Sequence, residues 1–306
     1  MELHLASMEN VSCWAFRKVC EGATDSYNGM LSMDYLIRRT KAWKEVDTYE
    51  IKGHRQWLQV AMVKEKECIE FLGRLKRELE SEEDKNFLYG IQINAACPSP
   101  EVIKLGQGSA LVKRPTKVAS LIQELLKQDI YKVGIKLRLG LNADEVKQKK
   151  ILSTLEQLEK IKNPNFTNVT IHFKHAREPS YTPYDYSLLN EICKFKLPLI
   201  INGGIKNYGD FQRIIKNIPV KKNIKGYMVA RGALENPDCF KDFRRGDGKI
   251  LAKRSFEEIS QEYKKNCEEH MPKSIYLTKT KKYCSWFPAD LEIPETPNDE
   301  GKKSFY

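Results

Sequence analysis

Hydrophobic and polar positions along the chain alternate between short apolar runs and longer amphipathic stretches. Eight of the short runs predict strands: Glu2–Ser7, Ser26–Met30, Trp57–Met62, Tyr89–Ala96, Lys132–Leu137, Asn168–Phe173, Leu197–Asn202 and Gly226–Ala230. Runs such as LPLII and GYMVA are continuously apolar, which is typical of parallel strands that are covered on both faces. The amphipathic stretches predict helices over Lys64–Leu79, Thr116–Lys127 and Ala143–Ile161, and two more that begin near Pro183 and Tyr208.

This regular alternation of strands and helices predicts the fold. Eight strand–helix repeats within about 245 residues are typical of a (β/α)8 TIM barrel of the α/β class. An open, doubly wound sheet is the alternative, but that fold favours a GxGxxG turn after its first strand, and the sequence has none there. We therefore predict a barrel over residues 1–245.

The chain changes character after residue 245. A GDG sequence interrupts the repeats, Phe256–Glu269 predicts one polar helix, and the Pro- and charge-rich end predicts loose order. We expect residues 246–306 to form a short, mostly helical C-terminal extension of the barrel.

The charge of the chain favours a polyanionic partner. Lys and Arg number 52 against 41 Asp and Glu, which gives a net charge of +11. Residues 246–306 contain 11 of each kind, so the whole excess belongs to the predicted barrel. A basic face on the folded domain follows, although a basic enzyme without such a partner would have the same count.

Other features exclude several classes of protein. No apolar run approaches the ~20 residues that span a bilayer, and the N-terminus lacks the pattern of a signal peptide. None of the eight cysteines is spaced as CxxC, which argues against a zinc ribbon or a thioredoxin-like motif. We expect a reduced, cytoplasmic, monomeric protein that binds neither a membrane nor a metal.

In a barrel the chemistry lies at the carboxyl ends of the strands, so the residues there are the candidates. Cys97 follows the fourth predicted strand in a turn with two prolines, where its thiol could be a nucleophile, a general acid or simply a buried side chain. Lys136 and Arg138 share one face of the fifth strand, and His172 and Lys174 share one face of the sixth. Cations that point into a barrel are unfavourable unless they meet an anion, although His172 could equally be a satisfied core histidine.

The last two predicted strands end in small residues. The seventh leads into Asn202-Gly203-Gly204, and the eighth into Ala230-Arg231-Gly232-Ala233. Loops after these two strands form the usual phosphate site of a TIM barrel. A phosphate-anchored cofactor with cations beneath it and a thiol across from it suits FMN, because a cation stabilises the negative charge of the reduced ring.

Seven segments of the chain, in order, resemble the motifs of the tRNA-dihydrouridine synthases, a family of FMN-dependent TIM-barrel flavoproteins. The segments are LASMENVSCWAFRKVC, WLQVAM, INAACPSPEVIKLGQGSALVKRP, GIKLRLG, IHFKHAR, IINGGI and GYMVARGALENPDCF. They cover about four fifths of the chain, residues 1–245. The resemblance implies an oxidoreductase that reduces the C5–C6 double bond of uridine in tRNA with NADPH or NADH.

The resemblance also implies roles for single residues. Cys97 would protonate C5 of the uracil while the reduced flavin delivers hydride from N5 to C6. Asn94 would contact the target base, with Arg138 nearby. The residues implied to contact FMN are Ala6, Met8, Gln59, Lys136, His172, Asn202, Gly203, Ala230 and Arg231. In this set Ala6 and Met8 would pack against the isoalloxazine, Gln59, Lys136 and His172 would contact the ring or the ribityl chain, and the last four would hold the phosphate.

Some positions depart from the family pattern. Ser7 replaces a proline before Met8, Ala95-Ala96 replaces a residue–glycine pair before Cys97, and Phe173-Lys174-His175 replaces Gly-Arg-Thr. The C-terminal segment of 61 residues resembles a shortened form of the family's helical tRNA-binding domain. Two alternatives remain open: an FMN-dependent free-pyrimidine oxidoreductase similar to dihydroorotate dehydrogenase, and an RNA-binding barrel that has lost its flavin.

Overall fold

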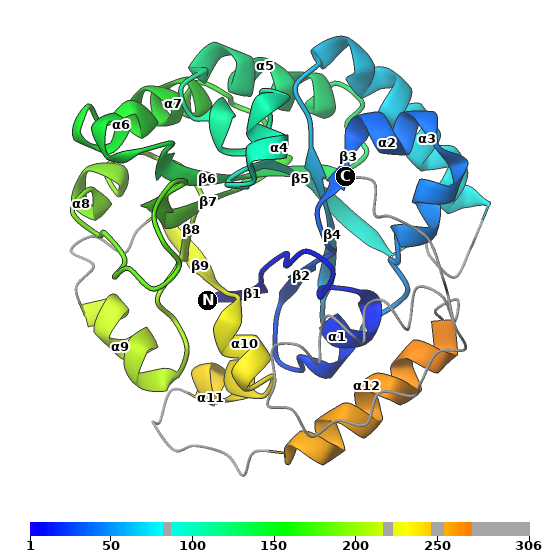
Figure 1. Ribbon diagram of the computed structural model, residues 1–306. Helices are drawn as coiled ribbons and strands as arrows, with labels where there is room; N and C mark the ends of the chain where they lie inside the picture. Colours follow the sequence, from blue (N-terminus) through cyan, green and yellow to red (C-terminus); the bar gives the residue numbers. More distant parts are fainter. Residues whose placement is uncertain (82–86, 217–222, 246–253, 271–306) are drawn as a thin grey trace.

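The apolar runs of the sequence form the walls of a closed parallel barrel (Figure 1). The computed structural model describes residues 1–81, 87–216, 223–245 and 254–270. The barrel strands are β1 (Glu2–Leu5), β2 (Asp25–Tyr27), β4 (Arg55–Ala61), β5 (Leu88–Ala95), β6 (Lys132–Gly140), β7 (Phe166–His175), β8 (Leu199–Asn202) and β9 (Ile224–Val229). Each pairs in parallel with its neighbours, and the pairing of β2 with β4 closes the ring. The predicted TIM barrel is confirmed.

All eight predicted strands are present, with ends that shift by a few residues. One further strand, β3 (Leu31–Ser32), pairs with β4 and was not predicted. It has only two residues, which are too few to give a recognisable hydrophobic pattern.

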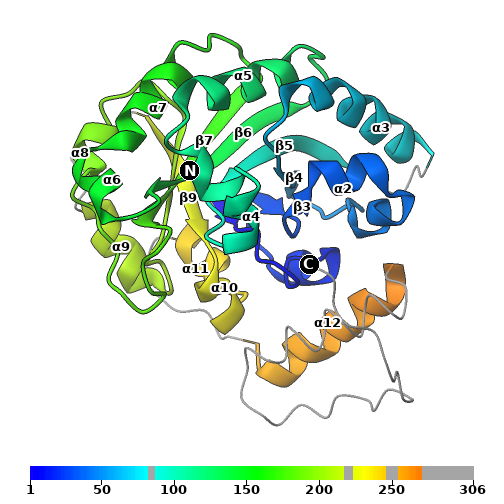
Figure 2. The same ribbon diagram turned by 45° about the horizontal axis from the view of Figure 1, so that its top comes forward.

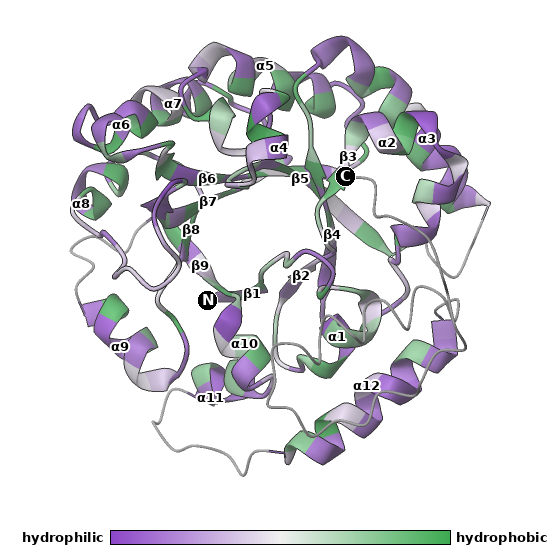
Figure 3. Cartoon of the chain, viewed as in Figure 1, coloured by the Kyte–Doolittle hydropathy of each residue, from purple (hydrophilic) through white to green (hydrophobic). Residues whose placement is uncertain are grey.

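Helices surround the barrel, as the turned view in Figure 2 shows. They are α1 (Trp14–Val19), α2 (Met33–Arg38), α3 (Cys68–Glu80), α4 (Pro100–Lys104), α5 (Pro115–Leu126), α6 (Ala143–Lys147), α7 (Lys150–Glu159), α8 (Leu189–Ile192), α9 (Tyr208–Lys216), α10 (Arg231–Glu235), α11 (Cys239–Arg245) and α12 (Phe256–His270). Hydrophobic and hydrophilic positions alternate along them (Figure 3). In α3 the buried positions are Cys68, Phe71, Leu72, Leu75 and Leu79, at the spacings of three and four that place them on one face. Within the described ranges, no helix combines the length and the hydropathy that crossing a bilayer requires.

Two predicted helices differ from the structure. The stretch Ala143–Ile161 is divided into α6 and α7, because Lys149 adopts a left-handed backbone conformation with φ 53°. No helix begins near Pro183. The chain between β7 and α8 forms turns, bends and irregular backbone instead, and its tyrosines bond Gly203 and Arg231 at the carboxyl end of the barrel.

The helix predicted at Phe256–Glu269 is α12, which packs on the outer side of α1 (Figure 1). The guanidinium of Arg254 donates to the buried carboxylate of Asp238 and to the carbonyl of Val19. At the other end of α12 the rings of His270 and Tyr49 stack with centroids 4.0 Å apart. The predicted boundary at residue 246 lies outside the described residues, so the division into two domains stays a prediction.

Candidate functional site

A cavity of about 510 Å³ opens at the carboxyl ends of β6 to β9. Seven of the predicted site residues line it: Lys136, Arg138, His172, Asn202, Gly203, Ala230 and Arg231. Pro98 lines it too, which brings the turn of Cys97 to its edge. Residues from four strand ends therefore meet in one place, as the barrel geometry requires.

Cys97 lies in a turn whose backbone is fixed by hydrogen bonds. The side-chain oxygen of Asn94 accepts from the backbone N–H of Ala96 at 3.0 Å and of Cys97 at 2.8 Å. The carbonyl of Cys97 accepts from the backbone N–H of Ser109 at 3.0 Å and from its hydroxyl at 2.8 Å. Gly108 has a φ of +58°, and a Cβ there would meet the Cys97 carbonyl at 2.8 Å, so only glycine fits. The thiol is half-buried, and burial raises its pKa.

Asn94 and Gln59 belong to a chain of buried amides inside the barrel. Asn94 donates to the side-chain oxygen of Gln59 at 2.7 Å, and Gln59 donates to that of Gln92 at 2.7 Å. Gln92 then donates to Asn168 at 3.2 Å and to Thr170 at 3.3 Å. Most of the hydrogen-bonding capacity of Asn94 thus goes to the Cys97 turn and to Gln59, so Asn94 positions this turn. Neither Asn94 nor Gln59 lines the cavity.

The cavity wall is rich in cationic side chains. Lys136 is only 9% exposed, and within the described part of the chain its ammonium has neither a hydrogen-bond nor an ion-pair partner. Burial, together with the nearby charge of Arg138, lowers the pKa of Lys136 to about 7. Burial also lowers the pKa of His172 well below its usual value, with help from Arg138, so the imidazole is neutral near pH 7. Burial makes positive charge in this wall unfavourable unless a ligand compensates for it, so the cavity favours an anionic or electron-rich ligand.

Arg138 links two sides of the cavity. Its Nε donates to the carbonyl of Ala96 at 2.7 Å, and its Nη1 donates to the carbonyl of His175 at 3.1 Å. It therefore braces the Cys97 turn against the end of β7.

Ala6 and Met8 do not line the cavity. Ala6 is fully buried and packs with Tyr27, Trp57 and Met228 inside the barrel, and Met228 does reach the cavity wall. Met8 is half-buried, and its backbone N–H donates to the hydroxyl of Ser12 at 2.8 Å. Contact of either residue with a flavin stays a prediction.

The sequence did not single out the segment after β7, residues 176–187, which also contributes to the cavity through Glu178, Ser180 and Tyr184. The ammonium of Lys174 donates to the carbonyls of Pro179 at 2.9 Å and Ser180 at 3.1 Å. The one signal for this segment is the run SYTPYDY at residues 180–186, which places three tyrosines in the loop after a strand.

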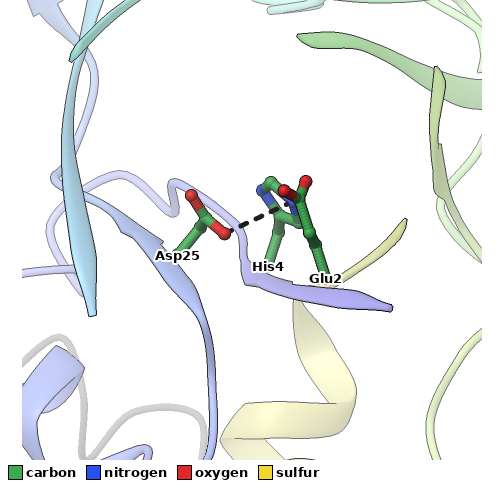
Figure 4. Close-up of side chains that lie close together, drawn as sticks. All are labelled: Glu2, His4 and Asp25. Carbon is green, nitrogen blue, oxygen red and sulfur yellow. Dashed lines mark hydrogen bonds and ion pairs between the residues drawn. The ribbon is translucent and has the colours of Figure 1, made fainter. Parts of the chain in front are cut away.

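A second polar cluster lies at the opposite end of the barrel, where Glu2, His4 and Asp25 face one another (Figure 4). Their side chains are close enough to share a cation. Arg55 supplies that charge, because its Nη2 lies 2.8 Å from Glu2 and 2.7 Å from Asp25. His4 is further held by the hydroxyl of Tyr27 at 2.9 Å. Arg55 thus makes the cluster part of an internal ion-pair network.

Solved structures resemble the fold of this chain. An old yellow enzyme homologue from Zymomonas mobilis superposes with a TM-score of 0.53 and 12% identity, and covers 86% of this chain and 94% of its own. Morphinone reductase in complex with tetrahydroNAD gives a TM-score of 0.50 with 14% identity, and covers 84% of this chain and 90% of its own. At these identities the likeness concerns the barrel fold alone.

Curated relatives match by sequence. The NAD(P)+ tRNA-dihydrouridine(20) synthase of Schizosaccharomyces pombe is 28% identical over 56% of this chain, and that of Saccharomyces cerevisiae is 30% identical over 56%. This chain spans only 35% and 45% of their respective lengths. A probable tRNA-dihydrouridine synthase of Aquifex aeolicus is 26% identical over 79% of this chain and 72% of its own length.

A model of the dihydrouridine synthase family matches residues 4–295, which is nearly the whole chain. The match includes every residue of the cavity wall and the turn of Cys97. The chain therefore belongs to the dihydrouridine synthase family.

Proposed function

We propose that this protein is an FMN-dependent tRNA-dihydrouridine synthase that reduces the C5–C6 double bond of uridine in tRNA with NAD(P)H. The observation that carries the proposal is the meeting of Lys136, His172 and Arg231 with the Asn202-Gly203 turn in one cavity edged by the Cys97 turn. Family membership and relatives that are named as tRNA-dihydrouridine synthases support it.

The residues of the cavity fit a flavin mononucleotide. The buried ammonium of Lys136 has no anionic partner among the described residues, and an electron-rich ring would give it one. Asn202, Gly203, Ala230 and Arg231 would hold the phosphate, in the loops after the last two barrel strands. His172, which is neutral and lines the same cavity, would contact the ring or the ribityl chain.

FMN bound here would supply the hydride for C6 of the uracil, after reduction by NAD(P)H. Cys97 would supply the proton for C5. Because burial raises its pKa, the thiol stays protonated at neutral pH and acts as an acid rather than as a thiolate nucleophile. Asn94 and Arg138 would hold the Cys97 turn in place, since both bond its backbone. Contact of Asn94 or Arg138 with the target base also remains part of the proposal.

Transfer RNA would approach the mouth of the barrel. A uridine must leave its stack to reach the cavity, and cations at the rim would hold the neighbouring phosphates meanwhile. Exposed cations do lie there, such as Lys104 at the end of α4 and Lys206 in the loop after β8. The net charge of +11 supports this use of the surface. We expect the reaction to take place in the cytoplasm.

Dihydrouridine in tRNA tests the proposal directly. The purified full-length chain, FMN and NADPH are incubated with tRNA that lacks the modification, and the nucleosides are measured by mass spectrometry. We expect dihydrouridine to form. Reduction of free uracil or oxidation of dihydroorotate without a product in tRNA would favour the free-pyrimidine enzyme. A colourless protein that binds tRNA and takes up no flavin would favour the flavin-free relic.

A further inference from the structure

The aromatic ring of Tyr184 lies directly on the turn that the proposed function assigns to phosphate. A Cβ placed on Gly203 would be 2.5 Å from Cδ1 and 2.6 Å from Cε1 of this ring. A Cβ on Gly204 would be 3.2 Å from Cδ2. Glycines in phosphate-binding turns commonly leave their bare face open so that the backbone can approach the ligand. Here the bare face of Gly203 is filled by Tyr184.

Tyr184 also interacts with the two cationic side chains beside this turn, those of Arg231 and Lys174. Nη2 of Arg231 donates to the Tyr184 hydroxyl at 3.0 Å and to the carbonyl of Ser180 at 3.3 Å. The ammonium of Lys174 lies 4.9 Å from the centre of the Tyr184 ring. Both cations therefore bond the protein's own segment where an anionic ligand would need them.

The segment that carries Tyr184 has a separate anchor. The hydroxyl of Tyr186 donates to the carbonyl of Gly203 at 2.8 Å, and the Tyr186 ring stacks on Phe173 with centroids 4.7 Å apart. The backbone N–H of Asp185 donates to the carbonyl of Phe173 at 3.0 Å. None of these contacts involves the side chain of Tyr184, so the segment keeps them when that side chain is displaced or truncated.

We propose that Tyr184 sets the affinity of the cavity for the phosphate of its cofactor, by filling the phosphate position until a phosphomonoester displaces it. The inference rests on the proposed flavin site. The phosphate can bind only after the bond from Arg231 to Tyr184 breaks, which costs free energy. The apparent affinity for FMN is therefore lower than it would be if Tyr184 did not occupy the phosphate-binding residues. Riboflavin has the same ring and no phosphate, so Tyr184 does not oppose its binding.

The test compares FMN with riboflavin on the full-length, flavin-free chain, by the quenching of flavin fluorescence. We expect Tyr184→Ala to bind FMN about tenfold more tightly than the natural protein, because the ring leaves the Gly203 turn and Arg231 is freed from its bond to the phenol, and to bind riboflavin unchanged. Tyr184→Phe keeps the ring and loses the bond to Arg231, so it should show a smaller gain. Inorganic phosphate should compete with FMN more strongly in both variants.

Tyr181→Ala is the matched control, since Tyr181 belongs to the same segment and is 87% exposed. It should change neither dissociation constant.

Two results for Tyr184→Ala would overturn the inference. Weaker FMN binding would mean that the phenol is a phosphate ligand, and equal changes for both flavins would mean that Tyr184 shapes the ring site. Unchanged FMN binding in both Tyr184 variants also overturns it, while the proposed function stands. If no protein binds either flavin, the proposed flavin site fails as well. Circular dichroism checks that each variant is folded. If Tyr184→Ala does not fold, Tyr184→Phe still tests the inference.

Discussion

At the scale of single residues, the protonation state of Cys97 decides what it can do. Its raised pKa makes it a proton donor at neutral pH. We predict that Cys97→Ala lowers dihydrouridine formation by ~10²–10⁴ fold while FMN binds as before, because general acid catalysis contributes about that much. Single-turnover oxidation of the reduced flavin by tRNA measures the step. A variant with an unchanged rate would show that the proton comes from another group.

Lys136 should make the stability of the flavin-free protein depend on pH. Its pKa is about 7 in the folded protein and 10.5 in the ordinary, solvated state, so between these values the unfolded chain holds a proton that the folded chain has lost. Stability then rises as the pH increases from about 7 toward 10.5. We predict that Lys136→Met stabilises the protein at pH 7 and below, on the order of 2–4 kcal/mol, and removes this rise.

Urea unfolding between pH 6 and about pH 9 measures the difference between Lys136→Met and the natural protein. Lys136→Arg is the control, because a guanidinium keeps its charge throughout and gives no such rise. Parallel pH profiles for Lys136→Met and the natural protein would contradict the prediction. A more stable variant with weaker flavin binding would mean that the buried charge is retained for its ligand.

At the scale of elements, the sequence predicted what depends on local pattern and missed what depends on distant contacts. Apolar runs identified every barrel strand, and the polar residues after the strands identified the cavity wall. The segment of residues 176–187 was missed because Tyr184 and Tyr186 are placed by Gly203, which no local pattern can reveal. The chain of amides from Asn94 to Gln59 likewise needs the barrel to close before its members meet.

The docking of α12 on α1 offers a test at this scale. Arg254 pairs with the buried Asp238 through two of its nitrogens and also bonds the carbonyl of Val19. We predict that Arg254→Ala destabilises the protein by about 1–3 kcal/mol, because it leaves a buried carboxylate without its main partner. Glu269→Gln is the control: its ion pair with Lys18 is exposed and should contribute less than about 1 kcal/mol. Equal losses for the two variants, measured by urea unfolding, would argue against a special role of Arg254.

At the scale of the whole molecule, one line of hydrogen bonds crosses the barrel from end to end. It runs from His4 through the hydroxyl of Tyr27 to Asn168, and then by Gln92 and Gln59 to Asn94 and the Cys97 turn. The two ends of this line differ in charge. Lysine and arginine side chains line the cavity at the carboxyl ends of the strands, whereas acids paired with Arg55 close the opposite end. The barrel thus separates ligand binding from stability.

Arg55 tests this separation. Asp25 is 0% exposed, so Arg55→Met removes the arginine that pairs with its buried carboxylate and with that of Glu2. We predict a loss of about 3–5 kcal/mol at pH 7, with unchanged FMN affinity in the variant at a temperature where it stays folded. Burial alone would raise the pKa of Glu2, but bonds from His4 and Arg55 lower it to about 2 from 4.5.

A carboxylate with a lowered pKa stabilises the fold above its ordinary value and loses that effect as the pH falls toward the folded value. The natural protein should therefore lose stability between pH 4.5 and about 2, and Arg55→Met should lose less over the same range. Chemical unfolding at several pH values, with FMN titrated in parallel, measures both quantities. A variant with normal stability and weakened FMN binding would contradict the separation, because the effect would then have passed along the amide line to the cavity.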